Sequence, residues 1–199
     1  YYFAKDNLEF QRLEKQFNDK KQWVDGVPKL KTIAQIFKEH GGYEIIGTVK
    51  GSELIGLEYI GPFDDLEAQN KPGGFPFVNE ELKDKGVTAV KQHRVINPGK
   101  DKMGNDIVVS GEGTGIVHMA PGCGDIDHKI GKSKNLINIA PLDEEAKFMG
   151  SFGWLNAKSA TDPDTIDKII TDLKDRKFLV HVEQYPHVYP HCWRSGDEL

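Results

Sequence analysis

The chain has 199 residues, of which 38% are hydrophobic and 29% charged, and its formal net charge is −5 at pH 7. These values fit a folded domain, and the acidic balance argues against a protein that coats nucleic acid. No run approaches the roughly 18 consecutive apolar residues of a membrane helix, so we expect no membrane contact. The chain shows no export leader, and Cys123 and Cys192 cannot build a disulfide framework, so we expect a cytoplasmic setting.

Helices are predicted at three places along the chain. Phe10, Leu13 and Phe17 recur at helical spacing near the start, which is Tyr-Tyr-Phe without a methionine and suggests a piece of a larger protein. A second helix is expected over 29–39, and Gly41 with Gly42 ends it.

The third helix, over 162–176, has the clearest pattern. Thr161 or Asp162 can cap it, Pro163 suits its first turn, and isoleucines with one leucine form an apolar stripe. Strand-like apolar runs lie between and after these helices, and they cover 43–49, 53–60, 87–96, 106–110, 114–119, 136–139 and 178–184.

The predicted strands outnumber the helices and are joined by hairpin-like turns such as that at 50–52. This pattern predicts an α+β fold that is mostly β, with a barrel-like core of short strands and peripheral helices. No linker rich in Pro, Gly or Ser divides the chain, so residues 1–199 are expected to form a single domain.

Glycine is over-represented, with 21 residues, and six of these lie between 104 and 124. The pattern of 111–128 predicts a glycine-rich turn followed by a strand. His118 is expected at the end of this strand and Asp127 in the loop that follows it. Such a strand end can bind a polar substrate, although glycines often mark turns only and a histidine there is often a packing residue. No Gly-Lys-Ser or Gly-Lys-Thr follows, so the segment is not a P-loop.

A metal site is an alternative interpretation of the same segment. Cys123, Asp125, Asp127 and His128 are all possible ligands, but no pair with the usual tetrahedral spacing accompanies them. The histidines and the cysteine of 185–192 are interrupted by prolines and lack a CxxC pair, so zinc is not expected there.

The residues Gly-Thr-Gly-Ile-Val-His-Met-Ala-Pro-Gly-x-Gly-x-x-Asp at 113–127 resemble the signature of the editing domain of isoleucyl-tRNA synthetase. This domain is the large connective insertion of a class I catalytic core. The valyl and leucyl relatives share the general pattern, but the valyl form usually has Lys where His118 stands. Residues 150–157 and 189–194 also resemble this insertion, the latter as the return to the catalytic core, and the similarity covers about 105–199.

The resemblance implies an editing domain over 1–199, with about 186–199 leading back to the core, and hydrolysis of valine wrongly attached to isoleucine tRNA. Valine is smaller than isoleucine by one methylene, and this difference gives a binding pocket too little discrimination between the two amino acids. Isoleucyl-tRNA synthetase is the standard example of an enzyme that must correct the resulting errors. By resemblance, Asp127 holds the α-ammonium group and His118 lines the side-chain pocket; these two are the expected catalytic residues. The expected substrate-binding residues are Thr114, Gly115, Met119, Ala120, Pro121, Gly122, Cys123 and Gly124.

The attacking group would be a water molecule, assisted by the neighbouring ribose hydroxyl.

The implied partners are the tRNA(Ile) 3′ end carrying valine and the rest of the synthetase chain, with the protein as a monomer. No cofactor or metal is expected in this domain, whereas ATP and Mg belong to the parent enzyme. Lys129, Lys132 and Lys134 are candidate RNA contacts or simply a solvated helix end.

The sequence also departs from the family pattern. Cys123 stands where several members have His or an aromatic residue, and Ile126 stands where an acidic residue is common. The family's threonine-rich peptide, which lines the opposite pocket wall, is absent from this sequence. Two alternatives therefore stay open: a non-catalytic module that binds the tRNA acceptor end or an aminoacyl ester, and a metal-dependent hydrolase.

Overall fold

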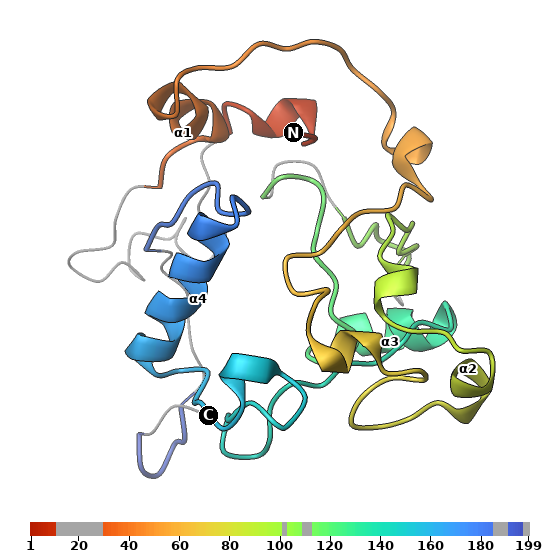
Figure 1. Cartoon of the computed structure of the whole chain (residues 1–199). Coiled ribbons are helices and arrows are strands. Elements are labelled where there is room, and N and C mark those ends of the chain that lie inside the picture. Colours follow the sequence, from red (N-terminus) through yellow and green to blue (C-terminus); the bar gives the residue numbers. More distant parts are fainter. Residues whose placement is uncertain (11–29, 101–102, 109–112, 185–190, 197–199) are drawn as a thin grey trace. The chain divides into compact units, whose positions relative to one another are not determined.

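The computed structural model describes residues 1–10, 30–100, 103–108, 113–184 and 191–196 (Figure 1). The chain divides into two compact units. The first consists of 1–48, 108–117 and 181–199, and the second of 49–107 and 118–180. Most of the first predicted helix lies outside the described residues.

The first unit contains η1 (Lys5–Asn7) and α1 (Ile33–Glu39). Thr32 caps α1 through a capping box: its hydroxyl accepts from Gln35 N at 3.2 Å, and the Gln35 side chain accepts from Thr32 N at 2.8 Å. Gly41 and Gly42 end the helix with φ of +101° and +94°, a conformation that glycine adopts without strain. The predicted helix near 29–39 is therefore confirmed over Ile33–Glu39, with Thr32 as its N-cap.

The second unit carries the remaining helices of the described chain. They are η4 (Gly51–Leu54), η5 (Glu67–Asn70), α2 (Glu80–Asp84), η6 (Val90–Gln92), α3 (Asp125–Ser133), η7 (Gly153–Leu155) and α4 (Pro163–Asp175). The predicted helix over 162–176 is confirmed as α4, because the Asp162 side chain accepts from Asp164 N at 3.2 Å and Pro163 begins the helix. No described helix is both long and apolar enough to cross a membrane.

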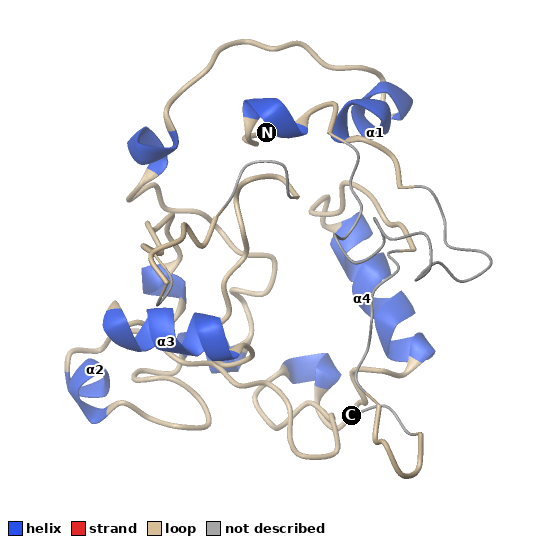
Figure 2. Ribbon diagram, turned by 180° about the vertical axis from the view of Figure 1, so that it is seen from behind, coloured by secondary structure: helices blue, strands red, loops and turns tan. Residues whose placement is uncertain are grey.

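The expected α+β, mostly β, barrel-like fold is wrong for the described part of the chain. Figure 2 shows helices and loops there, with no strand. The β-pairing that these residues make is limited to isolated bridges. The bridges join Glu58 to Arg94, Phe75 to Ile139, Lys100 to Asp106, Leu142 to Phe148 and Lys147 to Ser159.

The strand-like runs fail to become strands because they lack continuous partners. In 43–49, Ile45 and Ile46 are 62% and 94% exposed. A strand of such residues is stable when neighbouring strands bury one of its faces, and β-propensity reflects that packing rather than the backbone alone. The run 53–60 pairs briefly with 87–96, through Gly56 N to Val95 O at 2.8 Å, instead of forming the predicted hairpin with 43–49.

Two apolar clusters form the core of the second unit, and Ile139 packs against both. One cluster is built on Leu66, Ala68, Phe152 and Leu155, and the other on Leu82, Ala89 and Ile137. The segment 136–139, predicted as a buried strand, therefore lies at the centre of this unit even though it forms only a single bridge.

Backbone hydrogen bonds fix that segment to a distant loop. Phe75 N donates to Asn138 O at 3.0 Å, and Ala140 N donates to Phe75 O at 2.8 Å. Gly74, at φ +108°, allows this approach, because a Cβ there would lie 2.6 Å from Asn138 O. The position of 138–140 is thus set by a loop more than 60 residues earlier in the chain.

Arg176, just after α4, holds the end of that helix against the turn at 62–65. Its guanidinium donates to the Pro62 carbonyl, pairs with Asp65 at 3.2 Å and with Asp172 at 2.7 Å, and lies over the Phe63 ring at 5.4 Å. A planar guanidinium can make all these contacts at once, which a lysine ammonium cannot.

We expect Arg176→Met to lower the free energy of unfolding by about 1–3 kcal/mol, because the Pro62 carbonyl and two carboxylates lose a charged donor. Chemical denaturation of the chain measures this change. Lys174→Met, on an exposed neighbour in the last turn of α4, is the matched control and should change stability by about 0.5 kcal/mol or less. Equal effects of the two changes would contradict the role assigned to Arg176.

Candidate functional site

The residues predicted to form the site fall into both compact units. Thr114 and Gly115 belong to the first unit, whereas His118, residues 119–124 and Asp127 belong to the second.

Thr114 and Gly115 form a turn that packs on the N-terminal segment. The Thr114 carbonyl accepts from Ala4 N at 2.6 Å, and the buried Asn7 side chain donates to the Gly113 carbonyl at 3.0 Å. Gly115 has φ +76°, and a Cβ there would lie 2.4 Å from the Ala4 side chain. The Thr114 hydroxyl donates to the Ile116 carbonyl at 2.8 Å, so both residues serve the local turn in this structure.

In the second unit, residues 120–124 form a tight loop that leads into α3 (Figure 1). Cys123 N donates to the Ala120 carbonyl at 2.9 Å and closes the turn. Gly122 lies against the central segment so closely that a Cβ would be 1.9 Å from Ile139 O. On the other side of the loop, the ring of Pro121 packs against Gly131 of α3, where a Cβ would approach to 2.7 Å.

Asp127 lies in the first turn of α3, a helix that the sequence prediction had placed as a loop. Gly124 caps this helix in extended backbone, and His128 N donates to the Gly124 carbonyl at 2.7 Å. The half-buried Asp127 turns back to the loop, where its Oδ2 accepts from Ala120 N at 3.1 Å. Negative side chains are favoured in the first turn of a helix, which supports this placement.

His118 and Met119 precede this loop. His118 is exposed, and its imidazole forms no hydrogen bond or ion pair with any other described residue, while Met119 is half-buried. The sequence pattern marks His128 only as a possible metal ligand, whereas in the structure its Nδ1 lies 3.2 Å from the Pro121 carbonyl oxygen and 3.5 Å from Asn138 Nδ2. No sequence motif marks Asn138, because it is an isolated asparagine in an apolar run.

The charged residues of α3 divide into paired and exposed groups. The exposed Lys129 forms an ion pair with Asp125 one turn earlier, and Lys132 in the last turn and Lys134 at the C-cap are exposed as well. No three His, Cys, Asp or Glu side chains within the described ranges come close enough to hold a metal ion. The alternative of a metal site at Cys123, Asp125 and His128 therefore gains no support from the arrangement of these side chains.

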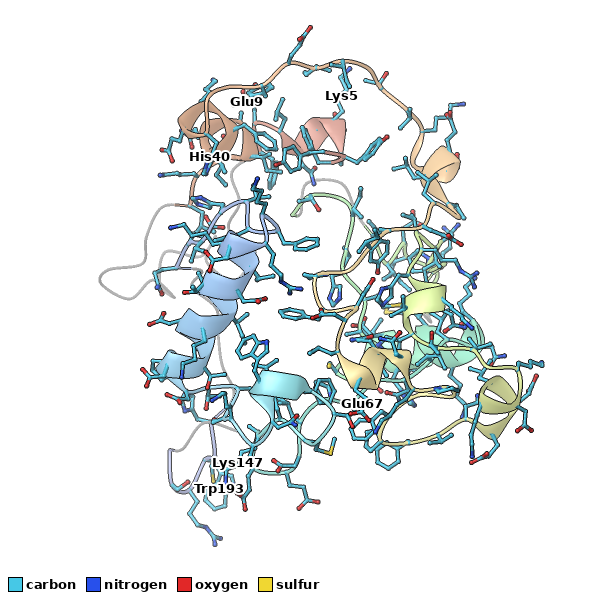
Figure 3. The ribbon with its side chains drawn as sticks, viewed as in Figure 1. Lys5, Glu9, His40, Glu67, Lys147 and Trp193 are labelled. Atoms are coloured by element: carbon cyan, nitrogen blue, oxygen red, sulfur yellow. The ribbon has the colours of Figure 1, made fainter. Side chains whose placement is uncertain are left out.

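The two cysteines occupy opposite electrostatic environments. Burial, and then the negative charge of Asp127, raise the pKa of the Cys123 thiol. The pKa of Cys192 is lowered to about 7 by hydrogen bonds from the Ser195 side chain and from the backbone of Ser195 and Arg194. Trp193, next to it, projects into solvent and is 87% exposed (Figure 3).

We expect Cys192 to react faster than Cys123 with a thiol reagent at pH 7, because the thiolate is the nucleophile and a pKa of about 7 leaves half of the Cys192 side chains ionised. The rate of disulfide exchange with an aromatic disulfide reports this difference. Cys192→Ser should remove the fast phase, and Cys123→Ser should retain it. A fast phase that follows Cys123 instead would reverse the assignment.

We expect Gly122→Ala to destabilise the chain by about 1–3 kcal/mol or more, because the added Cβ collides with the backbone at Ile139 rather than with a flexible side chain. Gly122 does not have positive φ, so strain in its own backbone is not the reason. Thermal unfolding measures the change. Gly150→Ala, where a Cβ meets nothing within 4 Å, is the control and should leave the midpoint nearly unchanged.

Comparison with known proteins identifies relatives over most of the chain. It is 35% identical over 170 residues to an isoleucine–tRNA ligase of Rickettsia peacockii, which covers 84% of this chain and 13% of that protein. It is 34% identical over 197 residues to the isoleucine–tRNA ligase of Methanocaldococcus jannaschii, covering 97% of this chain and 17% of that protein. A third relative, from Rickettsia bellii, is 35% identical over 158 residues.

The chain thus spans less than a fifth of the length of these relatives. The similarity also reaches beyond 105–199, because the alignment with the Methanocaldococcus protein includes nearly the whole first half. No family model matches the chain.

Proposed function

Because the chain belongs to the isoleucine–tRNA ligase family, we propose that it is the part of such an enzyme that hydrolyses valine wrongly esterified to tRNA(Ile). The observation that carries this proposal is the arrangement of Asp127. One carboxylate oxygen accepts from Ala120 N, and the other accepts no hydrogen bond from any described residue. A carboxylate held in this way is oriented and still has an oxygen available for a ligand.

The free oxygen suits the α-ammonium group of an aminoacyl ester. Hydrogen bonds between ionised partners are about twice as strong as those between neutral groups, and an ammonium can approach a carboxylate that projects from a rigid helix. The loop at 120–124 is packed on both sides. Gly122 lies against the backbone of Ile139, and Pro121 lies against Gly131 of α3. The small residues of the loop let the substrate approach the backbone closely.

In this proposal His118 lines the pocket for the amino-acid side chain, and size excludes isoleucine from it. A pocket that fits valine excludes isoleucine by steric conflict with its extra methylene. A second site of this kind can therefore hydrolyse the smaller, wrong amino acid and spare the correct one. Water attacks the ester, and no covalent enzyme intermediate is required. The wider partners, tRNA and the remaining synthetase chain, and a cytoplasmic monomer belong to the same proposal.

We expect Asp127→Asn in the full-length enzyme to reduce deacylation of valyl-tRNA(Ile) about 10- to 100-fold, since one charged hydrogen bond contributes about 1.5–3 kcal/mol. Asparagine keeps an acceptor for Ala120 N, so the loop is preserved while the negative charge is lost. Release of valine from pre-charged tRNA measures the rate. Asp125→Asn, an exposed neighbour in the same turn, should retain the rate within about twofold.

If the full-length enzyme releases no valine, or if Asp127→Asn matches the wild type, the proposed function is wrong. Binding of the ester without turnover would instead support the non-catalytic alternative. Loss of activity on dialysis against a chelator of transition metals would support the metal-dependent alternative.

A further inference from the structure

We propose that His128 is the general base that activates water in the ester hydrolysis proposed above, on which this inference rests. The sequence resemblance assigned no role to this residue. Its assignment comes from its place beside Asp127 and from the hydrogen bond that fixes its ring.

The carboxylate and the imidazole contact one dipeptide of the loop. Asp127 Oδ2 accepts from Ala120 N at 3.1 Å, and His128 Nδ1 lies 3.2 Å from the Pro121 carbonyl oxygen. Two residues of extended chain span about 7 Å at most, so these two contact points are separated by no more than that. The carboxylate and the imidazole therefore contact the same short stretch of the loop, and we infer that an ester whose ammonium binds Asp127 comes within reach of the imidazole.

Nδ1 of His128 has two polar neighbours, the Pro121 carbonyl oxygen at 3.2 Å and the Asn138 amide nitrogen at 3.5 Å. The shorter contact, to Pro121, favours a proton on Nδ1, whereas the longer one favours the opposite tautomer. A carbonyl oxygen can only accept a hydrogen bond, so the contact is favourable when Nδ1 of His128 carries hydrogen and donates it. The lone pair of the neutral ring then lies on Nε2. The His128 side chain is exposed, so Nε2 can be reached by water. A fixed tautomer of this kind is what a general base requires.

The charges around His128 come from two elements. Asp125, Asp127, Lys129 and Lys132 lie on α3; Lys129 is paired with Asp125, and the exposed Lys132 follows His128 by four residues on the same helix face. Cys123, on the preceding loop, has a raised pKa and so stays a neutral thiol near pH 7. The segment 136–140, which supplies Asn138, contains no titratable side chain. Asp127 is thus the negative group nearest in sequence to the imidazolium that forms during the reaction.

The proposed step balances without any further reactant. As the water oxygen forms a bond to the ester carbonyl carbon, Nε2 takes a proton from that water, and the carbonyl π electrons move onto the carbonyl oxygen. When the tetrahedral intermediate collapses, the bond to the ribose oxygen breaks. The imidazolium returns its proton to this oxygen, which gives free valine, the tRNA hydroxyl and neutral His128.

The test compares His128→Asn with wild type in the full-length enzyme between pH 5.5 and 8. Asparagine can still donate to the Pro121 carbonyl but cannot take up a proton. We expect the variant to be about 100-fold slower or more, and its rate to stay constant over the pH range in which the wild-type rate changes. KM should change by about twofold at most, since ammonium binding by Asp127 is retained.

Two further variants make the result specific. His128→Ala should regain part of its rate when free imidazole is added, which a purely structural residue would not show. His40→Asn, at the exposed end of α1, should leave both rate and profile unchanged. Circular dichroism melting of each variant reports folding, and the imidazole experiment decides the question if His128→Asn is destabilised.

The two proposals fail in different ways. A wild-type enzyme without deacylase activity overturns the editing function itself. An active wild type, with activity lost in Asp127→Asn but with an unchanged rate and pH profile in His128→Asn, overturns the role of His128 and leaves the editing function standing. Absence of imidazole rescue in a folded His128→Ala variant also contradicts the general-base role.

Discussion

The close approach of the loop at Gly122 to the backbone of Ile139 is the constraint on which the candidate site depends. A Cβ at Gly122 would lie 1.9 Å from Ile139 O, so no other residue fits there without moving the backbone. The segment that contains Ile139 also forms backbone hydrogen bonds with Phe75, the residue after Gly74. Backbone segments remote in sequence are therefore stacked directly on one another, and Ile139 packs into both apolar clusters beneath them.

This stacking determines how the side chains in the first turn of α3 are oriented. Pro121 packs on Gly131, so the loop is held against the helix that follows it. The first turn of α3 then faces back toward the loop. Asp127 then accepts from the Ala120 N–H, and His128 Nδ1 contacts the Pro121 carbonyl of the same dipeptide. The chemistry proposed for the site needs side chains held in this way, because a carboxylate or imidazole on a mobile loop would not keep one orientation toward a substrate.

Sequence reasoning succeeded where the structure is local. The caps Thr32 and Asp162 and the stop at Gly41 act within one or two turns, so α1 and α4 could be predicted from neighbouring residues. It failed for the strands, because the apolar runs at 43–49 and 178–184 need partners that no local pattern specifies. It also missed α3, whose cap is a glycine without a capping side chain.

The sequence by itself determined the family and predicted Asp127 and His118 as site residues, since the 113–127 signature and the relatives over 84–97% of the chain depend on residue identity alone. Only the tertiary structure decided how those residues are arranged. It assigned Thr114 and Gly115 to one compact unit and Asp127 to the other, and it brought His128 to the Pro121 carbonyl. The physical reason is that these contacts depend on packing between distant segments, such as Gly122 against Ile139.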